Sequence, residues 1–236
     1  MKDLRKDLTE TWRVATRAPV DNGGRTIMFM SAMAGEGTSS VAASFAMLAA
    51  QRARKGVWLI DLNLMDGRLF NAFDRGGDFV DSFGQVGPAH NAEMSGASFF
   101  SISPPPPPPP PGKKNDAGLF VMHRVADTKL LVSRFRKERL ESSARVRVKT
   151  GADYWKAVRE IADWVIIDAP ALETSSAGLA ICSQMDATAL VVRADKTPAT
   201  QVSKLGQEIE GHGGTCMGIV LNATKADARL ADEISG

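Results

Sequence analysis

Cysteine, tyrosine and long apolar runs are scarce in this chain. Its 236 residues include two cysteines, Cys182 and Cys216, and one tyrosine, Tyr154. Two distant cysteines in apolar surroundings form neither a disulfide framework nor a zinc spacing, so we expect two buried thiols. No apolar run approaches the ~18 residues of a membrane-spanning helix. The N-terminus lacks the apolar stretch of a signal peptide, and we therefore expect a cytoplasmic protein.

Net charge is also small. With 29 basic and 27 acidic residues the formal charge is +2, so no global field attracts nucleic acid. Basic residues do gather between Arg134 and Lys149. We interpret this cluster as the solvated face of a helix, with a surface for an anionic partner as the alternative. Hydrophobic residues make up 44% of the chain, which suffices for one α/β domain with an insertion.

Six short, nearly continuous apolar runs predict strands buried on both faces of a parallel sheet. They are Thr26–Ser31, Val57–Asp61, Leu119–His123, Trp164–Asp168, Ala187–Arg193 and Met217–Asn222. Apolar residues at helical spacing lie between several of these runs, in Val41–Ala49, Trp155–Ala162 and Val202–Ile209. This alternation predicts a doubly wound, mostly parallel α/β sheet with helices on both faces and its strand ends along one edge.

Two segments depart from the alternation. Lys2–Arg17 predicts an amphipathic helix, and we assign residues 1–24 as an N-terminal helix and linker. Residues 25–236 form the single α/β domain. Within it, residues 76–118 are predicted to be a flexible insertion, because Pro104–Pro111 is a run of eight prolines. We interpret the run as a solvated polyproline spacer, with a docking peptide for an aromatic groove as the alternative.

The clearest chemical signal is a glycine-containing turn between the first strand and the helix after it. Gly35 and Gly37 allow unusual backbone dihedrals, and the loop amides together with a helix N-terminus then form an anion site. Ala32–Ser39 keeps the second glycine and the hydroxyl residue of the phosphate-binding pattern G-x-x-x-x-G-K-[ST]. Alanine replaces the first glycine, and Thr38 replaces the lysine. Alone, the segment equally fits a glycine turn that binds nothing.

Polar residues that end three other predicted strands favour a nucleotide site. Asp61 and Asp168 end two strands at the edge where open α/β sheets bind ligands. Two carboxylates beside a phosphate-binding turn, with the hydroxyl of Ser39, suit Mg²⁺ either directly or through water. Asn222 ends a third strand, and its amide can donate to and accept from a base edge. Either aspartate could instead cap a helix.

Five motifs resemble, in order, those of the bacterial tyrosine kinases called BY-kinases: SAMAGEGTSS, VWLIDLNLMDGRL, DWVIIDAPA, TALVVRADKT and MGIVLNAT. BY-kinases are cytoplasmic P-loop domains paired with polysaccharide co-polymerases, and they belong to the wider class of septum-site and partition ATPases. The resemblance covers roughly Thr26–Phe73 and Tyr154–Thr224. It implies a P-loop NTPase-like fold, ATP or ADP with Mg²⁺, and a membrane co-polymerase as partner. It also implies self-association through the N-terminal helix, where Glu10, Trp12 and Arg13 are similar to the family's segment.

The same resemblance assigns roles by position. It implies that the phosphates are wrapped by Gly35, Glu36, Gly37, Thr38, Ser39 and Ser40. It implies that Mg²⁺ is bound by Ser39, Asp61 and Asp168, of which the two aspartates are also the catalytic carboxylates. Asp61 corresponds to the first aspartate of the Walker A-prime motif, and Asp168 to the Walker B aspartate. Asn222 is implied to contact adenine.

Three features depart from the family pattern. Thr38 replaces the lysine that meets the β- and γ-phosphates, Asn63 replaces a second aspartate, and Tyr154 is the one tyrosine where the family has a tyrosine-rich tail. Losing a charge-assisted contact of ~1.5–3 kcal/mol predicts nucleotide binding roughly ten- to a hundredfold weaker. Losing one transition-state donor predicts a rate ~10²–10³ lower. Arg25, Arg68 or a partner's arginine could supply the missing charge.

These departures favour a catalytically impaired, BY-kinase-like regulator of exopolysaccharide or capsule biosynthesis and export. It would bind nucleotide weakly or not at all, and it would reach the inner face of the plasma membrane through its co-polymerase. One alternative is an active ATPase or protein tyrosine kinase with a relocated cation. A second is a partition-type spatial-organising ATPase, whose DNA affinity would depend on the Arg134–Lys149 cluster. The near-neutral charge argues against a nucleic-acid partner.

Overall fold

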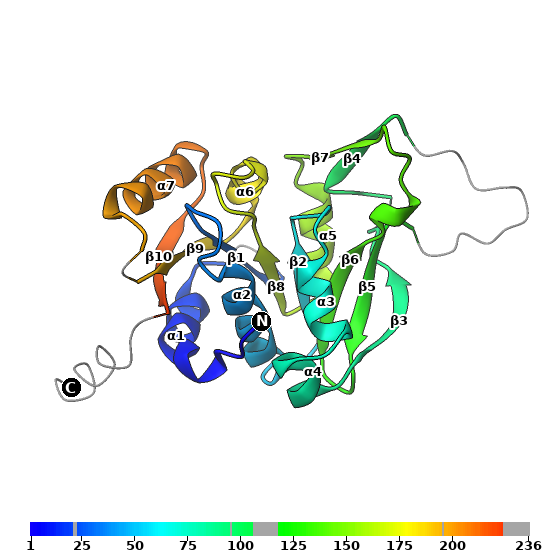
Figure 1. Cartoon of the computed structure of the whole chain (residues 1–236), viewed down its shortest axis with the longest axis horizontal. Helices are drawn as coiled ribbons and strands as arrows, with labels where there is room; N and C mark the ends of the chain where they lie inside the picture. The colour runs from blue at the N-terminus through cyan, green and yellow to red at the C-terminus, as the bar shows by residue number, and fades with distance from the viewer. Residues whose placement is uncertain (21–22, 95, 106–117, 195, 224–236) are drawn as a thin grey trace, which may run out of the picture.

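A mixed sheet of eight strands forms the centre of the molecule. The computed structural model describes residues 1–20, 23–94, 96–105, 118–194 and 196–223. The strands are β1 (Arg25–Met30), β2 (Val57–Asp61), β3 (Val86–Asn91), β5 (Phe120–Val125), β6 (Leu130–Phe135), β8 (Trp164–Asp168), β9 (Ala187–Arg193) and β10 (Cys216–Asn222). Their order is β10-β9-β1-β8-β2-β6-β5-β3 (Figure 1). A separate antiparallel ribbon joins β4 (Phe100–Ser103) and β7 (Arg145–Val148).

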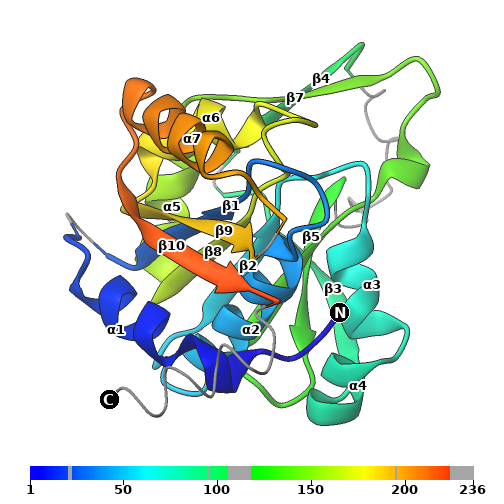
Figure 2. The ribbon, with the colours of Figure 1, turned by 60° about the vertical axis from the view of Figure 1, so that its left-hand side comes forward.

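Helices cover both faces of this sheet. They are α1 (Thr9–Arg17), α2 (Thr38–Ala50), α3 (Arg68–Asp74), α4 (Asp78–Phe83), α5 (Asp153–Ile161), α6 (Ala177–Ile181) and α7 (Ala199–Gly211), with short 3-10 helices η1 (Arg5–Leu8), η2 (Lys137–Arg139) and η3 (Cys182–Gln184). Helices α1 to α4 share one hydrophobic cluster, and α5 to α7 share the other. Figure 2 shows α1 and α2 on one side of the sheet and α5, α6 and α7 on the other.

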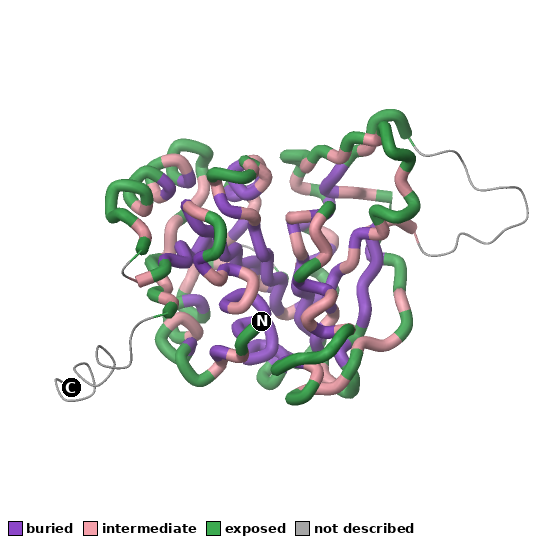
Figure 3. The backbone as a smooth tube through the Cα atoms, in the orientation of Figure 1, coloured by how far each residue is buried: buried purple, intermediate pink, exposed green. Residues whose placement is uncertain are grey.

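Alternation along the central strands divides the core between these two clusters. On β1, Ile27 and Phe29 face the α2 side, whereas Met28 and Met30 face the α5 side. Helix α2 is buried on nearly all sides, because nine of its 13 residues are alanine or a larger apolar residue. Since α2 begins directly after the glycine turn, the turn is attached to the most enclosed helix of the described chain (Figure 3).

The predicted fold class is confirmed: six strands, from β10 through β9, β1, β8 and β2 to β6, run parallel. Of the six strands predicted from the sequence, five lie in this parallel part and one is antiparallel to its neighbours. The run Leu119–His123 belongs to β5, which is antiparallel to both β6 and β3. A short turn joins β5 to β6, and such a turn can connect only antiparallel strands. The apolar character of β5 therefore reflects burial on both faces and says nothing about strand direction.

The basic cluster was assigned the wrong structure. Arg134–Lys149 spans the end of β6, the 3-10 helix η2 and strand β7, rather than a helix face. In β7 the residues Arg145, Val146, Arg147 and Val148 alternate between exposed and half-buried, which is the period of a strand. Seven cationic residues in this stretch favour a solvated helix face in the sequence, and the alternation in β7 is only four residues long.

The segments outside the predicted alternation also pack onto the domain. Leu4, Leu8 and Ala15 are buried, and the Trp12 ring lies 4.8 Å from that of Trp164. Self-association through this N-terminal helix stays a prediction. Residues 76–118 contain α4, β3 and β4 in their described part, while Pro106 to residue 117, most of the proposed polyproline spacer, lies outside the described residues.

Two smaller expectations have mixed outcomes. Cys182 is a buried thiol as predicted, but Cys216 is only half-buried because it lies on the edge strand β10. Among the described residues, no helix combines the length and apolar character needed to cross a membrane.

Candidate nucleotide site

The glycine turn between β1 and α2 has the backbone geometry of an anion-binding loop. Gly35 and Gly37 both have positive φ, +81° and +88°. A Cβ atom on Gly37 would lie 2.1 Å from Nδ2 of Asn222, whereas one on Gly35 would meet nothing within 4 Å. Helix α2 starts at Thr38, so its first amides lack partners within the helix and point into the turn.

Contacts from neighbouring strand ends hold this turn in place. On one side, Glu173, which follows β8, accepts a hydrogen bond from the backbone N–H of Ala34. On the other side, Asn222 donates through Nδ2 to the carbonyl of Glu36 at 2.7 Å. Thr197 donates its hydroxyl to Oε1 of the same glutamate, while Oε2 is buried without a partner in the described chain. The loop is therefore fixed without any ligand.

Asp61 and Asp168 lie directly beside each other at the carboxyl edge of the sheet. They are register partners in the parallel pair β2–β8, and adjacent strands lie about 4.8 Å apart. The Asp61 backbone N–H donates to Oγ of Ser133 at 2.9 Å, and Oδ1 of Asp61 accepts from the N–H of Asn63 at 2.8 Å. The sheet register thus brings together the two carboxylates that the sequence assigned to Mg²⁺.

Burial of these two carboxylates raises their pKa values, because it disfavours the charged form. Burial, opposed by a hydrogen bond from Ser39, raises the pKa of Asp168 from 3.8 to about 7. The pKa of Asp61 is also raised well above its usual value, mainly by burial and then by the charge of Asp168. A divalent cation would offset both effects, and this is the chemistry expected of a carboxylate pair that binds Mg²⁺.

A cavity of about 610 Å³ opens over the turn and the aspartates. Most of the predicted site residues line it: Gly35, Glu36, Gly37, Thr38, Ser39, Ser40, Asp61, Asn63 and Asp168. Asn222 does not line it. Both polar atoms of the Asn222 side chain are used within the chain, because its Oδ1 accepts from the N–H of Ala223 and its Nδ2 holds Glu36. The proposed adenine contact of Asn222 stays a prediction, and the structure gives this residue a role in positioning the loop.

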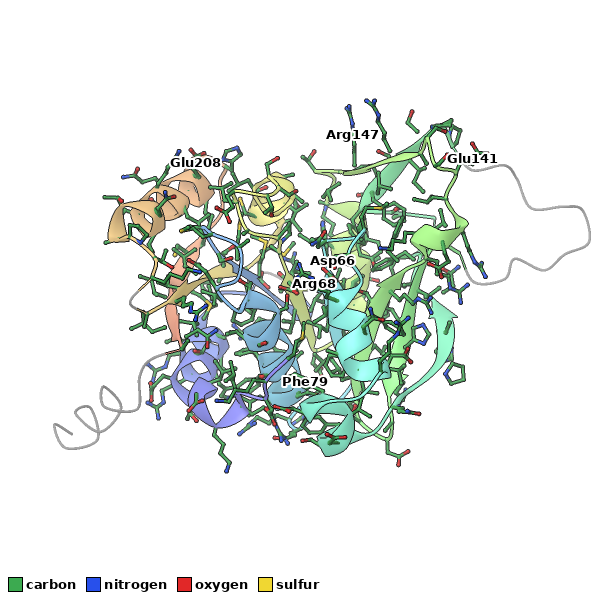
Figure 4. The ribbon with its side chains drawn as sticks, in the orientation of Figure 1. Asp66, Arg68, Phe79, Glu141, Arg147 and Glu208 are labelled. Carbon is green, nitrogen blue, oxygen red and sulfur yellow. The ribbon has the colours of Figure 1, made fainter. Side chains whose placement is uncertain are left out.

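The cavity contains little positive charge. Thr38 is buried at the start of α2, and among the described residues that line the cavity Arg68 has the one basic side chain, while Met1 also lines it. Arg68 pairs with Asp66, which also accepts from the Asn63 amide (Figure 4). Arg25, the other cation suggested by the sequence, lies at the opposite end of β1 and binds the carbonyls of Ala15 and Ala18. Arg25 therefore cannot replace the lysine.

A metal ion at this site would depend on few protein ligands. Within the described residues, no group of three or more His, Cys, Asp or Glu side chains is placed to hold a metal. Ser39, Asp61 and Asp168 would hold Mg²⁺ together with phosphate oxygens and water, as magnesium sites commonly do. The ion and a nucleotide would therefore bind together rather than separately.

Sequence reasoning missed the residues that support the site. Asp66 adds a third aspartate to the cavity, while Glu173 and Thr197 fix the turn. Each follows the carboxyl end of a predicted strand by a few residues, which is where ligand-binding loops of α/β sheets occur. Their position along the strands was available as a signal, but their partners depend on how the loops fold.

The single tyrosine lies far from solvent. Tyr154 is 2% exposed, among Phe99, Phe120 and Trp155, and its hydroxyl has no hydrogen-bond partner in the described chain. A kinase substrate must present its hydroxyl to the γ-phosphate. Tyr154 cannot do so in this folded state.

An open, mostly parallel α/β sheet with a phosphate-type turn after its first strand defines a P-loop NTPase-like fold. No protein-family model and no curated protein matches the sequence. Solved structures do share the fold. The VpsO kinase domain aligns with a TM-score of 0.59 and 17% identity over 94% of both chains.

Two further solved structures share this fold. The kinase domain of the Escherichia coli tyrosine kinase ETK gives a TM-score of 0.55 at 16% identity, over 94% of this chain and 77% of that chain. A ParA family ATPase from Chlorobium tepidum TLS gives 0.54 at 18% identity, over 89% and 79%. At such identities the likeness concerns the fold. That fold is the one shared by BY-kinase domains and ParA-type ATPases, the class that the motifs suggested.

Proposed function

We propose that this chain is a catalytically impaired, BY-kinase-like domain that binds Mg-ATP or Mg-ADP weakly and acts by docking rather than by phosphorylation. The observation that carries the proposal is the charge of the cavity. Asp61, Asp66 and Asp168 line it with one basic side chain, Arg68, and Thr38 occupies the lysine position.

The turn and the carboxylates support opposite expectations for phosphate. The positive φ angles and the α2 N-terminus favour an anion, whereas the three aspartates repel it. In a P-loop site a lysine would offset part of this repulsion by reaching the β- and γ-phosphates. Without it, Mg²⁺ becomes the main attractive charge, so nucleotide affinity should depend strongly on the metal.

The buried tyrosine supports the same proposal. Tyr154 is the only tyrosine in the sequence, and it lies inside an aromatic cluster. Autophosphorylation on tyrosine would require local unfolding of α5. A regulator that works through binding needs no such acceptor.

We assign the regulated process to exopolysaccharide or capsule biosynthesis and export, through a membrane co-polymerase at the inner face of the plasma membrane. Support comes from the five BY-kinase-like motifs and from the fold shared with the VpsO and ETK kinase domains. Deletion of the gene should lower polymer yield, and an Asp168→Asn allele should restore it. Unchanged polymer after deletion would contradict the assignment.

The biochemical test is turnover with saturating Mg-ATP. We expect phosphate release at least about a hundredfold slower than for the Thr38→Lys variant, since the lysine donor is worth ~10²–10³ in rate. We also expect no phosphotyrosine on a blot. Phosphate release by the natural chain that equals or exceeds that of Thr38→Lys, or strong phosphotyrosine labelling, would overturn the proposal.

One observation favours a second candidate, an active ATPase or tyrosine kinase. Arg68 lines the cavity at the start of α3, with its side chain largely exposed and, within the described residues, in an ion pair with Asp66, so it could swing toward a phosphate. In that case Arg68→Ala and Asp168→Asn should each abolish turnover, while Arg75→Ala, at the other end of α3, should not. Equal, negligible turnover in the natural chain and all three variants would exclude this candidate.

A further inference from the structure

Strand β7 has one edge that pairs with β4 and one edge that pairs with nothing described. In the ribbon, Val148 faces Phe100 and Arg145 faces Ser103, and beyond the ribbon Lys149 donates its N–H to the carbonyl of Phe99 at 2.7 Å. Residues of an antiparallel pair alternate between bonding to the partner strand and pointing away from it. Val146 and Val148 must therefore point their N–H and C=O groups away from β4.

The opposite edge of the ribbon supports this assignment. Phe100 faces Val148 and belongs to the same type of pair, so its backbone groups should also point outward. They do: the N–H of Phe100 donates to Oγ of Ser98 at 3.2 Å, and the Ser98 hydroxyl donates to the carbonyl of Phe100 at 3.0 Å. Ser98 thus satisfies the outer edge of β4. Across the described chain, nothing does the same for Val146 and Val148.

A groove of about 410 Å³ runs along this free edge of β7. It is lined by three successive strand residues, Val146, Arg147 and Val148. Side chains alternate between the faces of a strand, so three successive residues fit a groove along the strand's edge, and α6 contacts β7 on the far side of it. The opposite wall consists of Leu62–Met65 after β2 and of Ser175–Ala177 at the start of α6.

The two faces of β7 differ in character. Arg145, Arg147 and Lys149 are exposed on the outer face, and within the described residues none of them forms an ion pair. Figure 4 shows the Arg147 side chain pointing away from the body of the molecule. On the other face, Val146 and Val148 are half-buried and approach the wall that contains Leu62 and Leu64.

We propose that the free edge of β7 binds an extended peptide segment of a partner protein in which acidic and apolar residues alternate. The backbone of such a peptide would bond to the outward groups of Val146 and Val148 and so add a third strand to the ribbon. Its acidic side chains would lie beside Arg145, Arg147 and Lys149, and its apolar side chains would face Leu62 and Leu64.

A peptide bound in this groove would also affect nucleotide binding in the cavity. Asn63 and Ser175 line both spaces, so a bound peptide contacts the loop that follows Asp61. Coupling of this kind is reciprocal: if the peptide alters nucleotide affinity, the nucleotide alters peptide affinity by the same factor. Binding of the peptide itself requires no nucleotide, and it is tested without one.

The test uses the full chain and a fluorescein-labelled ten-residue peptide of alternating Glu and Val, followed by fluorescence anisotropy. We expect binding below 1 mM, about the weakest affinity worth measuring. A block peptide of five Glu followed by five Val should bind at least about tenfold weaker, because it cannot present the two residue types to opposite faces.

Backbone methylation provides a matched pair of probes. One peptide carries N-methyl groups on its Glu residues and the other on its Val residues, so that each lacks the N–H groups of one edge. Only one of these edges can face β7. Loss of binding by one methylated peptide and retention by the other supports strand addition. Equal binding by both methylated peptides overturns it.

Charge reversal tests the protein side. Arg147→Glu should bind the Glu–Val peptide at least about tenfold more weakly and should prefer a Lys–Val peptide, since like charges across a strand pair are unfavourable. Arg124→Glu, a change at another exposed position, on β5, that does not line the groove, should behave like the natural chain. An unaltered preference in Arg147→Glu contradicts the proposal. Binding of a single-stranded oligonucleotide of ten nucleotides, with no binding of any of the peptides, would also contradict the proposal.

Discussion

The nucleotide cavity and the β7 groove share two lining residues, Asn63 and Ser175, but have opposite charge. Asp61, Asp66 and Asp168 line the cavity, which by its backbone should take an anion. Arg147 lines the groove, with Arg145 and Lys149 on the same face of the strand. In both places the backbone geometry is suited to binding, through turn amides in the first and through a free strand edge in the second.

The difference shows what each place needs before it can bind. In the cavity, the side chains oppose the ligand that the backbone favours, so a divalent cation must reverse the local charge. In the groove, permanent cations already complement an acidic strand. We therefore expect ligand binding in the cavity to depend on metal and on pH near 7, and binding in the groove to need no metal and to weaken only below about pH 4–5, where the Glu side chains of the peptide become protonated.

The largest expected effect comes from the backbone of the cavity. Gly37→Ala should lower the free energy of unfolding by about 2–4 kcal/mol, because left-handed φ costs other residues ~1–2 kcal/mol and the new Cβ meets Asn222. Gly35→Ala also has positive φ but has open space around it, and should cost only ~1–2 kcal/mol. Urea unfolding measures both. Equal losses would show that the Asn222 contact does not constrain the turn.

The next effect concerns the charge of the cavity. The folded-state pKa of Asp168 is about 7, above its ordinary 3.8. The contribution of Asp168 to the free energy of unfolding is therefore fully present below pH ~4 and is lost as the pH rises through about 7. Asp168→Asn cannot ionise, and should exceed the natural chain by about 1–3 kcal/mol at pH 8.5 but not at pH 4. Urea titrations at both pH values provide the measurement. A stability difference independent of pH would contradict the assigned burial.

The smallest effect should come from the groove. Arg147→Gln removes one exposed cation with no ion pair in the described chain, so the free energy of unfolding should change by less than ~0.5 kcal/mol. This small change should be the same at pH 4 and pH 8.5. A pH-dependent loss comparable with the effect of Asp168→Asn would mean that the two regions do not differ as described.

Sequence reasoning succeeded where strand periodicity and strand ends determine the outcome. The runs that end in Asp61 and Asp168 are continuous and apolar, so the pattern predicts parallel strands with both carboxylates at one edge of the sheet, while the direct pairing of β2 with β8 comes from the structure. The turn could be located because Gly35 and Gly37 mark it. The apolar runs, their polar ends and the glycine turn each depend on a few neighbouring residues, so they can be predicted from the sequence.

The remainder depends on contacts between distant segments. Nothing near Asn222 in the sequence indicates that its amide binds Glu36, 186 residues away. The ribbon was missed because β4 and β7 are four residues each and lie on either side of the polyproline run. Arginine in β7 also suggested solvent, and its alternation with valine was too short to outweigh that signal.

The measurement that most directly tests the account is calorimetric titration of Mg-ADP into the natural chain and into Thr38→Lys. A lysine at this position restores a charge-assisted contact worth ~1.5–3 kcal/mol, so the variant should bind roughly ten- to a hundredfold more tightly. Equal affinity in the two proteins, with tight binding by the natural chain, would show that the cavity already supplies the positive charge that Thr38 does not.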